Sequence, residues 1–201
     1  MRNRKTLEMV QLAILTAIVV IFAFTPIGYL KTPAVEITFL CIPVAVGAIV
    51  LGPVPGMILG AVFGITSFLQ AALGMSTFGA TLFAINPVFT ALLCLVPRIL
   101  CGLLPAWIFR GLSRIKKLNL LSYGLSALSC ALLNTIFFVG GLILLFGRTD
   151  YIQGMQAGKN ILAFAVAFVG LNGLLEAIVT LFVGGAVAKG IEKANHRITN
   201  R

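Results

Sequence analysis

The chain has 201 residues, of which 60% are hydrophobic and only 10% are charged, and its mean hydropathy is +1.09. This composition excludes an ordinary soluble globular domain and predicts a polytopic membrane protein. The formal net charge of +10 would suit a nucleic-acid-binding protein, but the distribution of the basic residues described below argues against that class.

The apolar residues form six runs long enough to cross a membrane. A bilayer core of about 30 Å requires about 20 apolar residues per helix. We therefore expect an all-α membrane protein, a single bundle of six transmembrane helices over residues 1–201 with basic tails at about 1–6 and 190–201. We place the six spans near residues 7–27, 35–51, 56–72, 87–109, 120–146 and 161–190.

Turn-forming or polar segments separate the runs. The string "LGPVPG" at 51–56 has two prolines and two glycines in six residues, which predicts a tight turn between the second and third spans. Residues 73–86, "LGMSTFGATLFAIN", are rich in glycine yet still apolar, which is compatible with a loop that dips back into the membrane. Residues 113–119 and 147–160 are predicted to be the polar loops.

The basic residues gather on one side of this arrangement. The two tails and the linker after the fourth span lie on the same side if the chain crosses six times, and the opposite side has only Lys31, Arg148 and Lys159. By the positive-inside rule both termini are cytoplasmic, so the charge indicates topology in the cell membrane and no nucleic-acid partner. Eleven of the 15 Lys and Arg residues lie on the proposed cytoplasmic side: Arg2, Arg4, Lys5, Arg110, Arg114, Lys116, Lys117, Lys189, Lys193, Arg197 and Arg201.

The sequence contains neither a catalytic constellation nor a nucleotide-binding motif. Its five acidic residues and single histidine offer no pair spaced for metal-assisted hydrolysis and no Ser–His–Asp set. No G-x-x-x-x-G-K-[ST] loop is present. The four cysteines lie within predicted spans without C-x-x-C spacing, so we expect them to be buried apolar residues. We therefore expect no enzyme, no metal and no cofactor, and another chain must hydrolyse any ATP that is used.

Small residues recur at helical spacing in two spans. Gly56, Gly60 and Gly64 lie one turn apart in the third span, and Ala13 and Ala17 lie one turn apart in the first. In lipid, such small residues let helix backbones approach closely. We expect the glycines to pack against other helices of the same bundle. For the alanines two roles remain open, packing inside the bundle and docking to a partner protein.

Four polar side chains fall within the later spans: Arg98, Asn134, Asn172 and Glu176. An ionisable group inside a span costs about 2.5–3.5 kcal/mol on insertion scales, so it normally faces a partner or a polar cavity. With a rise of about 1.5 Å per residue, Arg98 lies roughly 17 Å and Glu176 roughly 22 Å from the outer surface. Two roles remain open for them, an ion pair that fixes helix register and a contact with a ligand.

Four strings together carry a family resemblance: "VEITFLCIPVAVGAIVLGPVPGMILGAVFGITSFLQ", "INPVFTALLCLVPRILCG", "ALLNTIFFVGG" and "LNGLLEAIV". In this order they resemble the substrate-binding S components of energy-coupling factor (ECF) transporters, and most closely the pantothenate-type branch. The resemblance implies a six-helix subunit that captures a vitamin at the outer face. It implies as partners a transmembrane coupling protein, EcfT, and two cytoplasmic ATPases. In this family an A-x-x-x-A motif on the first helix, here Ala13 and Ala17, docks on EcfT.

The resemblance also implies where the substrate binds. The lids would be residues 28–36 and 73–86, and a cation, one of Lys31, Lys159 and Arg98, would take the carboxylate of pantothenate. Amide side chains suit its amide and hydroxyl groups, because they both donate and accept hydrogen bonds. The expected substrate contacts are Asn86, Asn134 and Asn172, with Gln70 nearby, and the aromatic residues Phe78 and Phe138, with Phe83 and Phe137 as further candidates.

Two alternatives and one mutational expectation complete the sequence-based hypothesis. Folate, riboflavin or cobalamin S components share the fold. A flat ring ligand would want stacked Trp or Tyr, but Trp107 lies near the cytoplasmic end of the fourth span and the three tyrosines lie at span ends, which favours a small polar vitamin. A stand-alone secondary transporter would be expected to show inverted repeats, which we do not find. We expect Asn86 to contact ligand or lid, and Arg98 to brace the helices through Glu176, so that Arg98→Ala would impair folding more than affinity.

Overall fold

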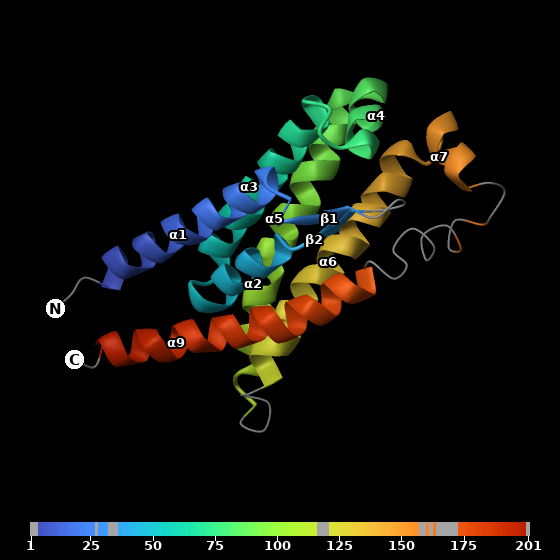
Figure 1. Ribbon diagram of the computed structural model, residues 1–201. Helices are drawn as coiled ribbons and strands as arrows, with labels where there is room; N and C mark the ends of the chain where they lie inside the picture. The colour runs from blue at the N-terminus through green and yellow to red at the C-terminus, as the bar shows by residue number, and fades with distance from the viewer. Residues whose placement is uncertain are drawn as a thin grey trace.

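The computed structural model describes residues 4–26, 28–31, 36–115, 121–156, 160, 163 and 173–199. Apart from one small hairpin, these residues form helices (Figure 1). The helices are α1 (Arg4–Phe24), α2 (Cys41–Val50), α3 (Pro53–Ala72), α4 (Thr77–Ile85), α5 (Pro87–Leu112), α6 (Leu121–Phe146), α7 (Asp150–Gln156) and α9 (Gly185–Thr199), and α9 is preceded by helical residues 173–179 and the π-helix η2 (Thr180–Gly184).

Five helices are long and apolar enough to cross a membrane, which makes the chain a multi-pass membrane protein. Four of them confirm predicted spans: Lys5–Phe24, Pro53–Ala72, Pro87–Leu112 and Leu121–Phe146. The fifth, Gly173–Asn195, covers the second part of the predicted span at 161–190, whose first part lies largely outside the described residues. The number of six spans remains a prediction.

The prediction for the second span was wrong in its boundaries. Residues Glu36–Thr38 form strand β2, which pairs antiparallel with β1 (Tyr29–Lys31), so the helix begins only at Cys41. The ten residues of α2 are too few for the about 20 that a span needs. Eight of these ten residues are buried, so α2 is a core helix enclosed by the longer ones.

The predicted turn at 51–56 is confirmed. Gly52 has a φ of +102°, a left-handed conformation that glycine adopts without strain. Pro53 follows at the first position of α3, where its missing N–H costs nothing because that donor has no partner inside the helix.

The glycines of α3 pack inside the bundle, as predicted, and their partner is α5. A methyl group at Gly60 would lie 2.2 Å from the carbonyl oxygen of Arg98. Gly56 faces Gly102, where the corresponding distance is 2.2 Å, and Gly64 faces Cys94, at 2.9 Å. The two helix backbones therefore touch along three successive turns, and this contact fixes the height of Arg98 relative to α3.

Two short helices lie in segments that were predicted to be loops. In the segment 73–86, Ser76 caps α4 by accepting a hydrogen bond from the Gly79 N–H. In the segment 147–160 the chain forms α7. Figure 1 shows α4 and α7 at the end of the molecule that is remote from both termini. They bury a second apolar cluster with the adjoining ends of α5 and α6, made by Leu82, Leu93, Leu142, Phe146 and Ile152.

The first and last helices meet at the terminal end of the molecule (Figure 1). The Gln11 Nε2 donates to Asn195 Oδ1 at 2.6 Å, and Asn195 Nδ2 donates back to Gln11 Oε1 at 3.3 Å. This reciprocal amide pair joins α1 to α9 at their terminal halves. The two termini therefore lie on one side of the bundle, as predicted, while their orientation in the membrane remains a prediction.

Candidate functional site

Three polar side chains from three different helices lie inside the bundle. They are Arg98 on α5, Asn134 on α6 and Glu176 on the last span, and we call them the polar cluster. Asn134 is only 6% exposed and Glu176 only 7%. Since burying such groups in a membrane protein is costly, their common location makes the polar cluster the candidate substrate site.

The guanidinium of Arg98 lies between two aromatic rings. Its Cζ lies 4.6 Å from the ring centroid of Phe138 on α6 and 5.4 Å from that of Phe63 on α3. The Arg98 Nη1 donates to the carbonyl oxygen of Leu93 at 2.8 Å, one turn earlier on the same helix. Cation–π contacts of this kind hold the charge and leave some of its N–H donors free for an anion.

Arg98 does not pair with Glu176 among the described residues, in contrast to the ion pair that we expected. The Arg98 Nε and the Glu176 Oε1 are both buried and have no hydrogen-bond partner in the described part of the chain. Arg98 thus braces α3, α5 and α6 through aromatic rings and not through a carboxylate.

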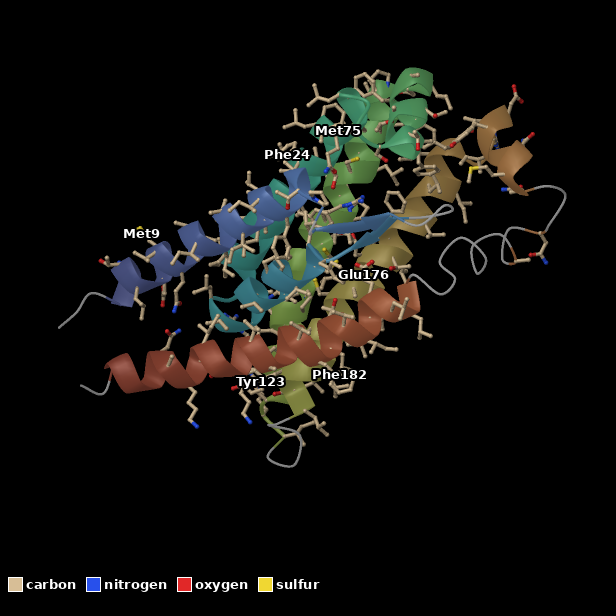
Figure 2. All side chains as sticks on the ribbon, in the orientation of Figure 1. Met9, Phe24, Met75, Tyr123, Glu176 and Phe182 are labelled. Atoms are coloured by element: carbon tan, nitrogen blue, oxygen red, sulfur yellow. The ribbon has the colours of Figure 1, made fainter. Side chains whose placement is uncertain are left out.

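Helix register places Asn134 level with Glu176. The last span runs antiparallel to α6, with Gly185 against Gly124 and Gly184 against Ala127. Continuing this register upward by about two turns brings Glu176 opposite Asn134. Asn134 Oδ1 has no partner within the described structure, and the turn above it on α6 carries Phe138, the ring beside Arg98. Figure 2 shows Glu176 on the side of the last helix that faces the bundle interior.

The four cysteines lie in the buried interior of the bundle. All four are buried and free, as predicted. The Cys101 thiol donates to the Arg98 carbonyl oxygen at 3.2 Å, and the Cys130 thiol donates to the Cys41 carbonyl oxygen at 3.6 Å. Cys101 and Cys130 thus satisfy backbone acceptors within the buried core.

Other predicted contact residues have structural partners. Asn86 caps α5, because its Oδ1 accepts from the Val88 and Phe89 N–H groups at 3.0 and 3.1 Å. Gln70 Nε2 donates to the Ala23 carbonyl oxygen and so ties α3 to the last turn of α1.

The remaining candidates are spread over several parts of the chain. The ring of Phe78 lies 6.1 Å from that of Tyr151, so Phe78 joins α4 to α7. Lys31 lies in β1, where its backbone pairs with Glu36. Asn172 and Lys159 lie outside the described residues.

Sequence reasoning missed Phe63, one of the two rings that hold Arg98. The sequence could have indicated Phe63, because this residue immediately precedes Gly64 on the glycine-rich face of α3. That face meets α5 at the level of Arg98, so an aromatic residue there was a candidate for a cation–π contact.

The small-residue face of α1 points away from the bundle. Ala13 and Ala17 are both exposed, and so is Val20 on the same face, whereas Leu15 and Val19 on the opposite side are buried. These alanines therefore do not pack inside the subunit, which leaves their face open to lipid or to a partner.

Bundles of long apolar helices that enclose a few polar and charged side chains are found in membrane transport proteins, where such side chains mark substrate pathways. Residues 7–185 match the family model described as the substrate-specific component of the ECF transporter. The chain belongs to this family and is a substrate-specific component of an ECF transporter.

Two relatives match the chain over nearly its whole length. The pantothenic acid transporter PanT of Lactococcus lactis subsp. cremoris (strain MG1363) is 28% identical over 98% of this chain and 99% of its own. The pantothenate transporter PanT of Leuconostoc mesenteroides subsp. mesenteroides is 30% identical over 93% of each chain. These similarities agree with the resemblance of the sequence motifs to the pantothenate-type branch of the family.

Proposed function

We propose that this protein is the subunit of an ATP-driven vitamin importer that captures pantothenate at the outer face of the cell membrane. Two full-length relatives that carry the name of pantothenate transporters support this substrate. The protein would deliver its ligand inward together with the coupling protein EcfT and two ATPase subunits. That division of labour fits a sequence without a phosphate-binding loop of its own.

The observation that carries the proposal is the set of buried polar atoms in the polar cluster that have no partner among the described residues. Pantothenate presents a carboxylate, an amide and two hydroxyl groups. Arg98 would bind the carboxylate through its free N–H donors. Asn134 would form hydrogen bonds with the amide of pantothenate, and Glu176 would accept hydrogen bonds from its hydroxyl groups. A cation, an amide and an acid thus match the three kinds of group on the ligand.

The proposed orientation places the termini in the cytoplasm. The described basic residues on this side, Lys5, Arg110, Arg114, Lys189 and Lys193, are all exposed, as the positive-inside rule requires. The opposite end, which α4 and α7 cover (Figure 1), would then face outward and admit the vitamin.

Titration calorimetry of the purified protein against a panel of vitamins tests this function. We expect pantothenate to bind with a dissociation constant in the nanomolar to low micromolar range. Folate, riboflavin and cobalamin serve as the alternatives. If one of these binds in place of pantothenate, the substrate changes but the class of importer stands. If no vitamin binds, the proposal is wrong.

Bulky substitutions on the small-residue face of α1 should separate binding from transport. We expect Ala13→Trp or Ala17→Trp to abolish vitamin uptake by cells, because an indole would keep EcfT from close approach to the helix. Pantothenate affinity of the purified variant should not change, since both alanines are exposed on the face of α1 that points away from the bundle. Transport is measured as uptake of labelled pantothenate by cells, and affinity is measured by calorimetry of the purified variant.

The matched control for these variants is Ile136→Trp on α6. Ile136 is 62% exposed on an apolar helix surface, so this change adds the same indole elsewhere on the lipid-facing surface. It should leave uptake unchanged. Equal uptake by the Ala13→Trp variant and the wild type would remove the docking role from this face.

A further inference from the structure

The last helix carries a row of basic residues along its exposed side. Lys189 and Lys193 lie one turn apart on α9, and both are exposed. Arg197 occupies the next position of this row by helical register. With a rise of about 1.5 Å per residue, the three positions extend over about 12 Å of the helix. We call Lys189, Lys193 and Arg197 the basic row.

The opposite side of α9 is held by the rest of the bundle. Ala188 is buried, and a methyl group at Gly185 would lie 2.8 Å from the Gly124 Cα on α6. Asn195 exchanges two hydrogen bonds with Gln11 on α1. These contacts fix the rotational position of the helix, so the basic row stays directed away from the bundle.

The two lysines of the row make no polar contact with the rest of the described structure. Neither the Lys189 nor the Lys193 ammonium forms a hydrogen bond or an ion pair in the described part of the chain. The one acidic residue of α9 is Glu192, and its Oε2 atom is buried. The ammonium groups are therefore available to an anion outside the subunit.

The exposed side chains of the last span change from apolar to basic near the start of α9. Phe182 and Val187 are 68% and 42% exposed, and the exposed side chains that follow include Lys189 and Lys193. A helix in contact with lipid shows this change where it leaves the hydrocarbon core. The basic row therefore lies at the level of the lipid headgroups, with an apolar surface directly above it.

We propose that the basic row binds the headgroup of an anionic phospholipid. The Lys189 and Lys193 ammonium groups would donate hydrogen bonds to the phosphate oxygens, while the acyl chains lie along the apolar surface above them. Gly190 lies between the two lysines, and no atom lies within 4 Å of a methyl group added there, so a headgroup can approach the helix backbone. A lipid fits this face better than an acidic protein does, because the charged row and the lipid-facing apolar surface are continuous.

The inference does not rest on the proposed function. The basic row lies on the side of α9 that faces away from the bundle, whereas the polar cluster lies inside it. Binding of a lipid at the row requires neither a vitamin nor a coupling protein. It would hold the terminal end of the subunit at the membrane surface, with a strength that depends on the lipid composition.

A single tryptophan near the basic row can report which lipid is bound. Trp107 is the only tryptophan of the chain, and Trp107→Phe removes it. Phe182 points away from the bundle about two turns above Lys189 (Figure 2), so Phe182→Trp in the same chain places an indole beside the acyl chains. In vesicles of phosphatidylcholine and phosphatidylglycerol, brominated acyl chains on one lipid at a time quench this indole in proportion to the amount of that lipid beside it.

We expect this reporter protein to prefer phosphatidylglycerol over phosphatidylcholine by at least about fivefold, the gain that one basic side chain near an anionic surface provides. Lys189→Gln combined with Lys193→Gln should abolish the preference. Lys189→Arg combined with Lys193→Arg should retain it, because the charge is kept. The matched control, Arg110→Gln combined with Arg114→Gln, removes the same charge from exposed residues near the end of α5 and should also retain it.

Three results would overturn the proposal. If the reporter protein shows no preference for phosphatidylglycerol, the basic row serves topology or an acidic partner protein. If the lysine-to-glutamine variant retains the preference, the lipid binds elsewhere. If both glutamine variants lose it equally, the overall charge of this end attracts the lipid. Both leaflets of the vesicles have the same composition, so the orientation of the protein does not affect the result. None of these measurements uses pantothenate, so they remain decisive even if no vitamin binds and the proposed function fails.

Discussion

Substitution of Arg98 by glutamine is expected to weaken pantothenate binding by about tenfold to a hundredfold, the effect of losing a hydrogen bond between charged groups. Arg98 is the cation of the polar cluster, and its Nε has no partner among the described residues. A neutral amide at this position cannot supply the charge that a carboxylate ligand requires.

The same substitution should leave the protein folded. Because Arg98 does not pair with Glu176 in the described structure, its removal does not strand a carboxylate in a broken ion pair. The loss is limited to the contacts with the Phe63 and Phe138 rings and to the hydrogen bond to the Leu93 carbonyl oxygen. This expectation differs from that drawn from the sequence, in which Arg98 braced the helices through Glu176 and its loss impaired folding first.

Calorimetry of the purified Arg98→Gln variant measures its affinity for pantothenate, and thermal unfolding measures its stability. Arg110→Gln is the matched control, because Arg110 is an exposed arginine near the end of the same helix, and it should change neither measurement. Wild-type affinity in a folded Arg98→Gln variant would exclude Arg98 from the substrate site. A variant that does not fold would show that the aromatic contacts are required for structure.

Gly60→Ala is expected to destabilise the protein strongly, by about 1–3 kcal/mol or more, as overpacking does in close-packed cores. The added methyl group would lie 2.2 Å from the Arg98 carbonyl oxygen and 3.2 Å from the Ile99 Cα. These atoms belong to the backbone of α5, so no side-chain rotation relieves the clash. The helices must separate, which also displaces Arg98.

Gly140→Ala provides the control for Gly60→Ala. Gly140 lies on α6 and has no atom within 4 Å of an added methyl group. Its replacement should be neutral or stabilise the helix by about 0.5–1 kcal/mol, since alanine loses less entropy than glycine. Expression yield and melting temperature in detergent compare the two variants. Equal melting temperatures would show that α3 and α5 tolerate a larger separation than their close contact suggests.

The features that the sequence predicted well depend on local chemistry. Four spans follow from the length of their apolar runs, and the turn at Gly52 and Pro53 follows from residues that break helices. The packing of Gly60 was predictable because in lipid a repeated small residue has few roles other than close helix contact.

The features that the sequence did not predict depend on neighbours distant in the chain. The helix α2 is shortened because residues 36–38 pair with Tyr29–Lys31, and no periodicity signals that pairing. The aromatic partners of Arg98 come from α3 and α6, which are distant from Arg98 in the sequence. The π-helix η2 (Thr180–Gly184) was also not predicted, because no residue pattern in the last span distinguishes it from an α-helix.

The amide pair between Gln11 and Asn195 has a consequence for the order of events during synthesis. Its two residues are 184 positions apart, so α1 enters the membrane long before the ribosome has made its partner. The contact between α1 and α9 can form only at the end of translation, and contacts between residues so distant in the sequence form slowly. A nascent chain that ends before Asn195 would lack the amide pair that joins α1 to α9. Synthesis of the last turns of α9 therefore completes the contacts of the subunit.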